Sequence, residues 1–469
     1  MDNLRSSVFL AKRAYRGLFI YAVGALALVS LAGRATGSLL SAFILLGVLL
    51  SKSVPFCESA FLALCFGMVV GTKDFAYLHL RIGSMPVYIS ELSLGLIIFT
   101  LFMRSFAGGG FPLRFRWIDF ALLLFWVAGI YASLRGRESP LLALRDFAIV
   151  YYSVFFWLAR AIFHYHPQIY RLLRVLLVGS MVTAGQAFLN YALQREIEPT
   201  APLSNVSIGR FMHGFMGTFI VVALVVLFAC WRTLPDKVPW FGVFCFLGAS
   251  LALTQQRSIF LSVVVGFVFM AFLGRKDRLV VWTPILATLS VGLFAASLYA
   301  FADVSSDFLA KTLERLYSGF FKFGSDPTVN FRFDTWNEAW SRFVQDPVRG
   351  EGFGIPFVFF YGIGGGYVLE DVRPHNTFLT VLYKMGLVGF LPFVATMGAF
   401  YLFLFHAFRR AKEEKVPLLS LGAAHVALLV LGSFNLLLES PYQSFLFWTL
   451  MGLVYAVAPR SVSPPKAAA

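Results

Sequence analysis

Long apolar runs separated by short polar segments make up most of this chain. A helix that crosses a membrane needs about 20 apolar residues, within a range of roughly 17 to 25, and the runs have about this length. We therefore predict an all-α, polytopic transmembrane helix bundle with twelve to fourteen spans. The uncertainty in the count comes from the first runs, two of which only Lys52 separates. The candidate spans are residues 17–33, 35–51, 54–71, 87–103, 117–134, 147–163, 172–193, 214–231, 240–254, 258–274, 279–301, 387–408, 418–436 and 441–458.

One connection, residues 302–374, is much longer and more polar than the others. It contains two stretches with helical periodicity, each of which predicts an amphipathic helix that lies on the membrane or caps the bundle. A glycine-rich segment, 350–367, follows them and suits a mobile loop over a site. We therefore divide the chain into a bundle (1–301), a large loop (302–374) and a second bundle part with a tail (375–469). The apolar stripes of the two predicted helices are Leu309, Leu313, Leu316 and Phe320, and Phe333, Trp336, Trp340 and Phe343.

Basic residues indicate the orientation of the spans. Placing the N-terminus in the cytoplasm puts most arginines and lysines in the inner loops, as the positive-inside bias requires. Both termini are then cytoplasmic, and the large loop lies on the outer face. The basic N-terminal stretch MDNLRSSVFLAKRAYR resembles a signal peptide, but no cleavage site follows it, so we expect a membrane anchor.

Composition agrees with this class of protein. Of the 469 residues, 59% are hydrophobic and 13% charged, whereas soluble domains are about a quarter charged. The net charge of +15 is spread in small groups without a long basic face, which argues against a nucleic-acid partner and for membrane lipids or diphosphate ligands. The four cysteines lie inside apolar runs, so we expect buried thiols, with neither disulfides nor a metal site.

Three ionisable residues near predicted outer ends of spans are candidates for chemistry. Arg257 lies between two apolar runs and could bind phosphate or simply reach the headgroups. Arg210 precedes another span beside Gly209, and its alternative is an interfacial arginine at a helix start. His375 could act as a general base or as a structural hydrogen-bonding residue.

The segment that begins at His375 carries a resemblance to a known family. His375 and Asn376 are followed by nine residues, Gly386, two residues and Gly389. This pattern resembles the signature of the O-antigen ligase family, which also includes O-antigen and exopolysaccharide polymerases. The stretch QQRSIF around Arg257 and the position of Arg210 are similar to further family features, and the resemblance covers roughly residues 200–458.

The resemblance implies a function and roles for these residues. Such enzymes of the bacterial inner membrane transfer a glycan from undecaprenyl diphosphate to an acceptor hydroxyl on the periplasmic side. Arg210 and Arg257 would bind the diphosphate, Asn376 would contact substrate, and His375 would activate the acceptor in a direct displacement with inversion. Two fixed guanidinium groups could replace a divalent metal, and the sequence has no Asp-x-Asp motif, so we expect neither cofactor nor metal.

Several alternatives remain open at this point. The acceptor is the lipid A core in a ligase and another lipid-linked glycan in a polymerase, and the motif favours the ligase only narrowly. A transporter or flippase of a lipid-linked sugar would also place arginines near a cavity, but the sequence lacks the internal repeat that many transporters have. A structural scaffold is a third class. Lys384 cannot be assumed to share a site with His375, and for the loop arginines we favour solvated charges on helices: Arg332, Arg349 and Arg373.

Overall fold

The computed structural model describes a large part of the chain. The described residues are 56–82, 85–104, 115–136, 139–163, 166–193, 195, 211–230, 237–254, 256–274, 327–361, 367–369 and 373–458. The expected spans 17–33, 35–51 and 279–301 and the first amphipathic stretch of the loop lie outside these residues, as does Arg210.

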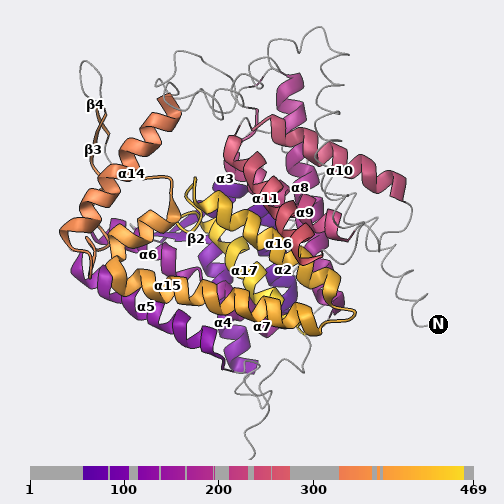
Figure 1. Ribbon diagram of the computed structural model, residues 1–469, viewed down its shortest axis with the longest axis horizontal. Coiled ribbons are helices and arrows are strands. Elements are labelled where there is room, and N and C mark those ends of the chain that lie inside the picture. The colour runs from indigo at the N-terminus through magenta and orange to yellow at the C-terminus, as the bar shows by residue number, and fades with distance from the viewer. Residues whose placement is uncertain are drawn as a thin grey trace, which may run out of the picture.

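The described residues form an all-α helix bundle, which confirms the predicted fold class (Figure 1). Two short antiparallel hairpins accompany it, β1 (His79–Ile82) with β2 (Met85–Tyr88) and β3 (Phe359–Tyr361) with β4 (Tyr367–Leu369). The helices are α2 (Phe56–Val70), α3 (Thr72–Ala76), α4 (Ile89–Arg104), α5 (Trp117–Arg135), α6 (Pro140–Tyr151), α7 (Val154–Ile162), α8 (His166–Ala192), α9 (Gly214–Ala229), α10 (Lys237–Ala252), α11 (Arg257–Leu273), α14 (Pro327–Gln345), α15 (Thr377–Arg410), α16 (Lys415–Gly432) and α17 (Pro441–Val457).

Several of these helices have the dimensions of membrane spans. Within the described residues, four are long and apolar enough to cross a membrane, namely α5, most of α8, α15 and α16, and the bent pair α6 and α7 brings the number to five. Five shorter apolar helices, in α2, α4, α9, α10 and α11, accompany them. The protein is therefore an integral membrane protein, and the total of twelve to fourteen spans stays a prediction.

Several expected spans begin earlier in the structure: α15 begins at Thr377 rather than 387, α8 begins at His166 rather than 172, and the span expected at 147–163 differs as well. Instead of a single helix over 147–163, a helix begins at Pro140 and bends by 42° where α6 meets α7. The early start follows from local chemistry, because Ser139 accepts a hydrogen bond from the backbone N–H of Leu142 at 3.3 Å and proline suits the first turn. Asp146, which the sequence placed before the span, thus lies inside α6.

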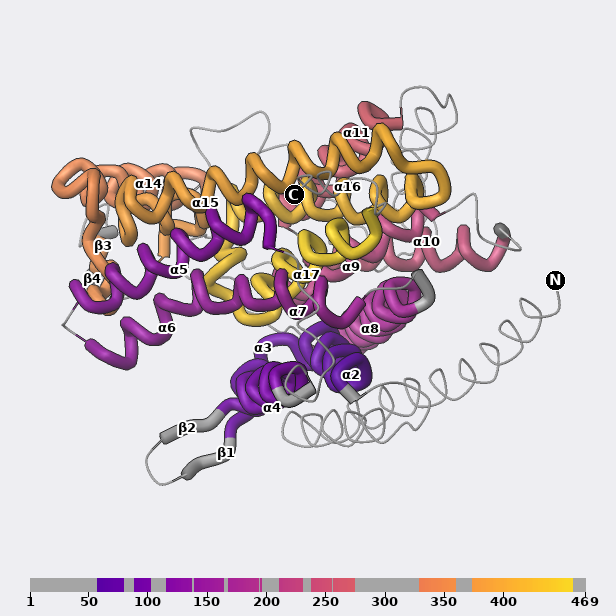
Figure 2. The backbone as a smooth tube through the Cα atoms, turned by 90° about the horizontal axis from the view of Figure 1, so that it is seen from below, coloured from indigo at the N-terminus to yellow at the C-terminus, as the bar shows by residue number. Residues whose placement is uncertain are grey.

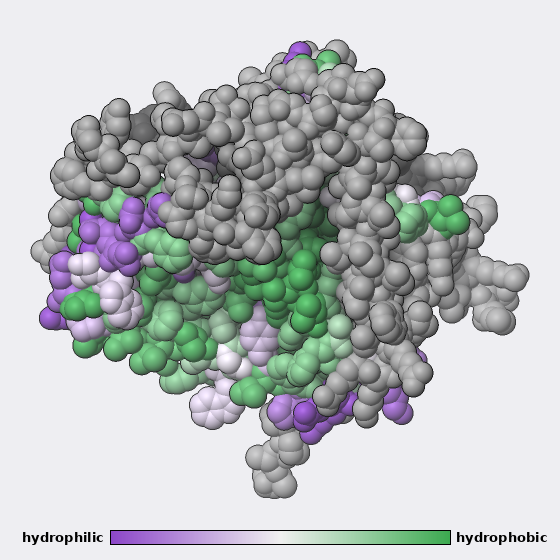
Figure 3. All heavy atoms as spheres, turned by 45° about the horizontal axis from the view of Figure 1, so that its top comes forward, coloured by the Kyte–Doolittle hydropathy of each residue, from purple (hydrophilic) through white to green (hydrophobic). Residues whose placement is uncertain are grey.

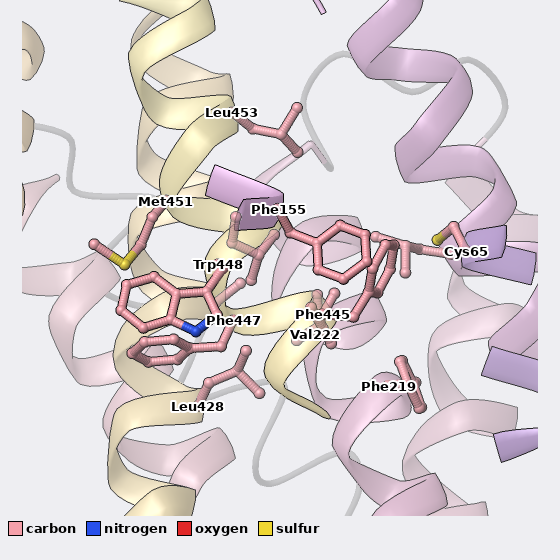
Figure 4. Close-up of a cluster of buried hydrophobic side chains, with 14 of the residues drawn as sticks. Cys65, Phe155, Phe219, Val222, Leu428, Phe445, Phe447, Trp448, Met451 and Leu453 are labelled. Atoms are coloured by element: carbon pink, nitrogen blue, oxygen red, sulfur yellow. The ribbon is translucent and has the colours of Figure 1, made fainter. Parts of the chain in front are cut away.

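The core of the bundle surrounds α17. All residues of α17 from Pro441 to Tyr455 are buried, as expected for a helix that is apolar on every side. Figure 4 shows Phe445 of α17 near Phe155 of α7, and their ring centres are 4.7 Å apart in an edge-to-face arrangement. Phe61 of α2 completes this contact at 5.4 Å from Phe445. Helices far apart in sequence are thereby held in one bundle, with α16 packed against α9, α11 and α17.

The outer faces of α5 and α15 carry exposed apolar side chains. Figure 3 shows a hydrophobic area on one face, with hydrophilic side chains at its margins. On α5 and α15 the exposed residues include Val127, Leu134, Leu391 and Leu402. A contiguous apolar surface of this kind fits contact with lipid. Figure 2 shows α5 and α15 running side by side along the bundle, with α14 at one end. We call this end the α14 end.

Candidate active site

His375 lies in a tight turn at the start of α15. Its φ angle is +48°, in the left-handed region that non-glycine residues rarely adopt. The next residue, Asn376, is the N-cap of α15, and its side-chain oxygen accepts a hydrogen bond from the N–H of Leu379 at 3.1 Å. The asparagine of the motif therefore has a structural role, because asparagine is among the best helix N-caps. Its predicted contact with substrate stays a prediction.

The surroundings of His375 favour the neutral imidazole. The side chain is partly buried, and its pKa is lowered to about 4, first by burial and then by the cations Arg332 and Arg373. Near neutral pH the ring therefore carries one proton and one free lone pair. A neutral imidazole is the form that can take a proton from a hydroxyl.

Thr377, in the first turn of α15, connects this turn to the segment between α16 and α17. Its hydroxyl is 3.3 Å from the carbonyl of Asn435 and 3.4 Å from a carboxylate oxygen of Glu439, and it accepts the N–H of Leu437 at 2.9 Å. Glu439 is buried, its other carboxylate oxygen has no partner within the described part of the chain, and burial raises its pKa. A buried carboxylate oxygen without a hydrogen-bond partner costs free energy, so the position of Glu439 calls for an explanation.

The same segment connects His375 to Arg257. The side-chain amide of Asn435 donates to the hydroxyl of Ser258 at 2.9 Å, and Ser258 follows Arg257 in the first turn of α11. Arg257 is partly buried at the first position of that helix. The structure thus brings the beginnings of α11 and α15 to one end of the bundle, as the predicted site requires.

The helices α9 and α17 also begin at this end. Gln256, the N-cap of α11, packs so closely on Gly214 that a Cβ there would lie 2.1 Å from the glutamine oxygen. Phe215, in the first turn of α9, contacts Tyr442 of α17, with ring centres 5.0 Å apart. The N-terminus of a helix carries a partial positive charge and unpaired N–H groups. Arg257 and four such ends are thus found at one end of the bundle, and helix N-termini favour anions.

The amphipathic helix α14 covers the turn that contains His375. The indole N–H of Trp336 donates to the carbonyl of Pro374 at 2.6 Å, and its ring lies 6.2 Å from that of Phe434. The second predicted helix of the loop is therefore confirmed as α14, and Figure 1 shows it at one edge of the bundle, next to β3.

The two glycines of the motif have packing roles. α15 breaks at Gly386, where φ is +59° and ψ is −163°. The loop after α14 lies against this break and is joined to it by backbone hydrogen bonds: the N–H of Leu387 donates to the carbonyl of Pro347 at 2.9 Å, and that of Val388 donates to the carbonyl of Val348 at 3.1 Å. A Cβ on Gly389 would meet the side chain of Met385 at 2.4 Å. Glycine is thus required where backbone approaches backbone or helix closely.

A buried ionic cluster lies between α6, α15 and the loop. Lys384 and Asp146 are 3.3 Å apart and both nearly inaccessible, and Arg373 reaches the same carboxylate at 3.4 Å. Glu351 pairs with Arg342 of α14 at 3.2 Å, and burial raises the pKa of Glu351. The prediction of a solvated charge is therefore wrong for Arg373, whose side chain is only 13% exposed.

Lys384, Arg349 and Arg332 differ in their positions relative to His375. Lys384 contacts Asp146, which also binds Arg373, so it belongs to the surroundings of His375 despite nine residues of separation. Arg349 is 58% exposed and pairs with Asp346, as a solvated charge would. Arg332 of α14 acts electrostatically on His375. Asp146 is not among the residues expected in the site, although a carboxylate inside an apolar run, LLALRDFAIV, is a signal for function.

The sequence predicts buried thiols without disulfides, and a reaction without a metal. All four cysteines are free; Cys57, Cys65 and Cys245 are buried as expected, whereas Cys230 is only partly buried. Among the described residues, no group of three or more histidine, cysteine or acidic side chains could hold a metal ion. The expectation of a metal-independent reaction stays a prediction.

Comparison with known proteins supports the resemblance noted in the sequence. No curated protein matches the chain. Residues 241–394 match the model of a family described as O-antigen ligase. This segment extends from α10 into α15 and contains Arg257, α14, His375 and Gly386. A match of this kind does not separate the ligase type from the polymerase type. Residues 241–394, roughly a third of the chain, which include Arg257 and His375, are therefore similar to the O-antigen ligase family.

Proposed function

We propose that this protein transfers a glycan from undecaprenyl diphosphate to the lipid A core, at the α14 end of its bundle. In this proposal the α14 end faces the periplasm, the bundle lies in the bacterial inner membrane, and both termini are cytoplasmic. One observation carries the proposal: Asn435 and Thr377 hold the start of α11, with Arg257, and the turn of His375 at the same end of the bundle.

In this proposal Arg257 and the helix N-termini stabilise the leaving group. Breaking the bond between the anomeric carbon and the diphosphate oxygen leaves negative charge on the diphosphate. Arg257 and the beginnings of α9, α11, α15 and α17 lie where they could stabilise that charge. Arg210, which precedes α9 in the sequence by a few residues, is proposed as the second guanidinium. Since arginine stays charged, this stabilisation needs no metal.

In this proposal His375 acts on the acceptor hydroxyl. In the proposed step the neutral imidazole takes the hydroxyl proton, and the oxygen forms a bond to the anomeric carbon from the side opposite the diphosphate. The diphosphate leaves with the electron pair of the broken bond, and the configuration at the anomeric carbon inverts. The low pKa of about 4 for His375 keeps the ring neutral before the reaction. A general base of this type typically contributes a factor of about 10² to 10⁴ to the rate.

A polymerase would use the same residues with a different acceptor. The chemistry at the anomeric carbon is identical when the hydroxyl belongs to a second lipid-linked glycan. The family match covers both activities. The difference must then lie in the loop that receives the acceptor, which includes α14 and the hairpin of β3 and β4.

The experiment that tests the proposal uses purified protein in detergent with chelator present. It is given undecaprenyl diphosphate-linked glycan and, in separate reactions, lipid A core or a second lipid-linked glycan. Glycan attached to the core supports the ligase, and longer lipid-linked chains alone indicate the polymerase. If neither product forms in several lipid environments, the glycosyltransferase proposal fails, and transport of the lipid-linked sugar in vesicles becomes the next test.

A further inference from the structure

Asp146 of α6 joins segments from three distant parts of the chain. Its carboxylate is 3.4 Å from a guanidinium nitrogen of Arg373 and 3.3 Å from Nζ of Lys384. It also accepts the backbone N–H of Gly354 at 3.1 Å. Arg373 is two residues before His375, Lys384 is on α15, and Gly354 belongs to the loop after α14. A single carboxylate therefore contacts one residue before His375, one residue after it and the loop that follows α14.

The turn of residues 373–376 is held from three directions. Asp146 contacts Arg373 from α6, and Trp336 binds the carbonyl of Pro374 from α14. Thr377 binds the segment between α16 and α17 on the third side. His375 itself has an uncommon backbone conformation, with φ at +48°. Such a conformation persists only when its surroundings determine it, and Asp146 supplies the only one of these three contacts that involves a charge pair.

Stability alone does not account for this arrangement. A buried ion pair is often no more stabilising than apolar side chains of similar volume, because both charges lose their hydration. The neighbouring carboxylate Glu351 already pairs with Arg342, so it does not replace Asp146. The arrangement is explained if the position of Arg373, and with it the adjacent His375, must be well defined.

We propose that Asp146 is a positioning residue, which places the His375 turn through Arg373 and the overlying loop through Gly354. The catalytic part of this inference rests on the proposed function, whereas the positioning part rests on the contacts alone. Asp146 touches neither donor nor acceptor in this proposal. Its loss therefore alters the placement of His375 relative to the acceptor, and leaves binding of the diphosphate at the start of α11 largely intact.

The test compares Asp146→Asn with wild type and with Asp119→Asn in purified full-length protein. Asp119 of α5 is the matched control, because it is also a buried carboxylate paired with a buried arginine, Arg160, outside the α14 end. The first readout is hydrogen exchange of residues 350–361 and 373–379. We expect faster exchange in both segments for Asp146→Asn and no change there for Asp119→Asn. Unchanged exchange in Asp146→Asn overturns the proposal.

The second readout is the kinetics of glycan transfer. We expect kcat to fall by about a hundredfold in Asp146→Asn, the size of effect that a small misplacement of a reacting group can have, with little change in KM for the donor. Asp146→Glu keeps the charge and should recover part of kcat. A similar loss in Asp119→Asn, or faster exchange with an unchanged kcat, overturns the catalytic part of the proposal.

Two arrangements keep the test decisive. If Asp146→Asn alone does not fold, the double variant with Lys384→Gln removes the uncompensated buried charge and still leaves Arg373 without its carboxylate. If wild type transfers no glycan to any acceptor, the proposed function fails, and hydrogen exchange alone still decides whether Asp146 positions the turn.

Discussion

Gly386 offers a sharp test of how the loop after α14 is attached to the bundle. The residue has φ +59° and ψ −163°, a region that essentially only glycine occupies. A Cβ at this position would lie 2.4 Å from the carbonyl oxygen of Val348 and 2.5 Å from the backbone nitrogen of Gly350. Both are backbone atoms, so no side-chain rotation relieves the overlap. Gly386→Ala must therefore either strain α15 or displace the loop.

The magnitude follows from these two costs. Holding a non-glycine residue in this conformation costs about 1–3 kcal/mol. Displacing the loop weakens two backbone hydrogen bonds, from Leu387 to Pro347 and from Val388 to Val348, each worth about 1 kcal/mol. We expect Gly386→Ala to destabilise the protein by roughly 2–5 kcal/mol.

The assay is thermal unfolding in detergent, combined with trypsin cleavage at the exposed Arg349. Gly398→Ala is the matched control on the same helix, because a Cβ there meets nothing within 4 Å. In a helix, replacing glycine by alanine stabilises by roughly 0.5–1 kcal/mol. The two variants should thus change the midpoint in opposite directions, with faster cleavage only in Gly386→Ala. If both have the same midpoint and the same cleavage rate, the close docking of the loop on α15 is wrong.

Two further predictions concern charges at the α14 end. Arg257→Gln should weaken donor binding by roughly 10- to 100-fold, the loss expected for one charge-assisted contact of about 1.5–3 kcal/mol. Arg410→Gln, at the other end of α15, is the control and should leave donor binding unchanged. Equal effects of the two variants in donor titrations would contradict the assignment of Arg257 to donor binding. Arg373→Gln removes a cation that lowers the pKa of His375, so that pKa should rise from about 4 toward its ordinary value near 6.5. Because the neutral ring is the active form, the acid limb of kcat/KM then moves to higher pH, and a limb that stays in place or moves lower argues against this electrostatic coupling.

The sequence was sufficient for many of the described helices, and it supplied Arg257 and His375 as candidates, whose roles stay predictions. Apolar runs of spanning length predicted α5, α9, α11 and α16 within a few residues, because burial in lipid makes hydropathy a strong signal. It was less informative where hydrogen bonding decides the bounds. The cap at Ser139 extends α6 through the charged Asp146, and Gly386 breaks α15 inside an apolar run. Neither feature changes hydropathy.

The surroundings of His375 depend on contacts between distant segments. Asn435 and Ser258 are separated by 177 residues, and Gly354 and Asp146 by 208. Periodicity along the chain contains no information about such pairs. The motif supplied His375 as a candidate, but the span was expected from residue 387, whereas α15 begins at Thr377. The packing roles of the two glycines depend on the loop that lies against Gly386.

The most direct test of the account is the activity of His375→Ala beside His406→Ala. Both histidines belong to the same part of the chain, but His406 is exposed on α15 and binds only the carbonyl of Leu402 in its own helix. Glycan transfer is measured with donor and acceptor, and donor binding is measured separately. We predict that His375→Ala binds donor normally and loses about 10²- to 10⁴-fold in kcat, whereas His406→Ala resembles wild type. Transfer by His375→Ala at the wild-type rate would contradict the central claim that this turn supplies the base.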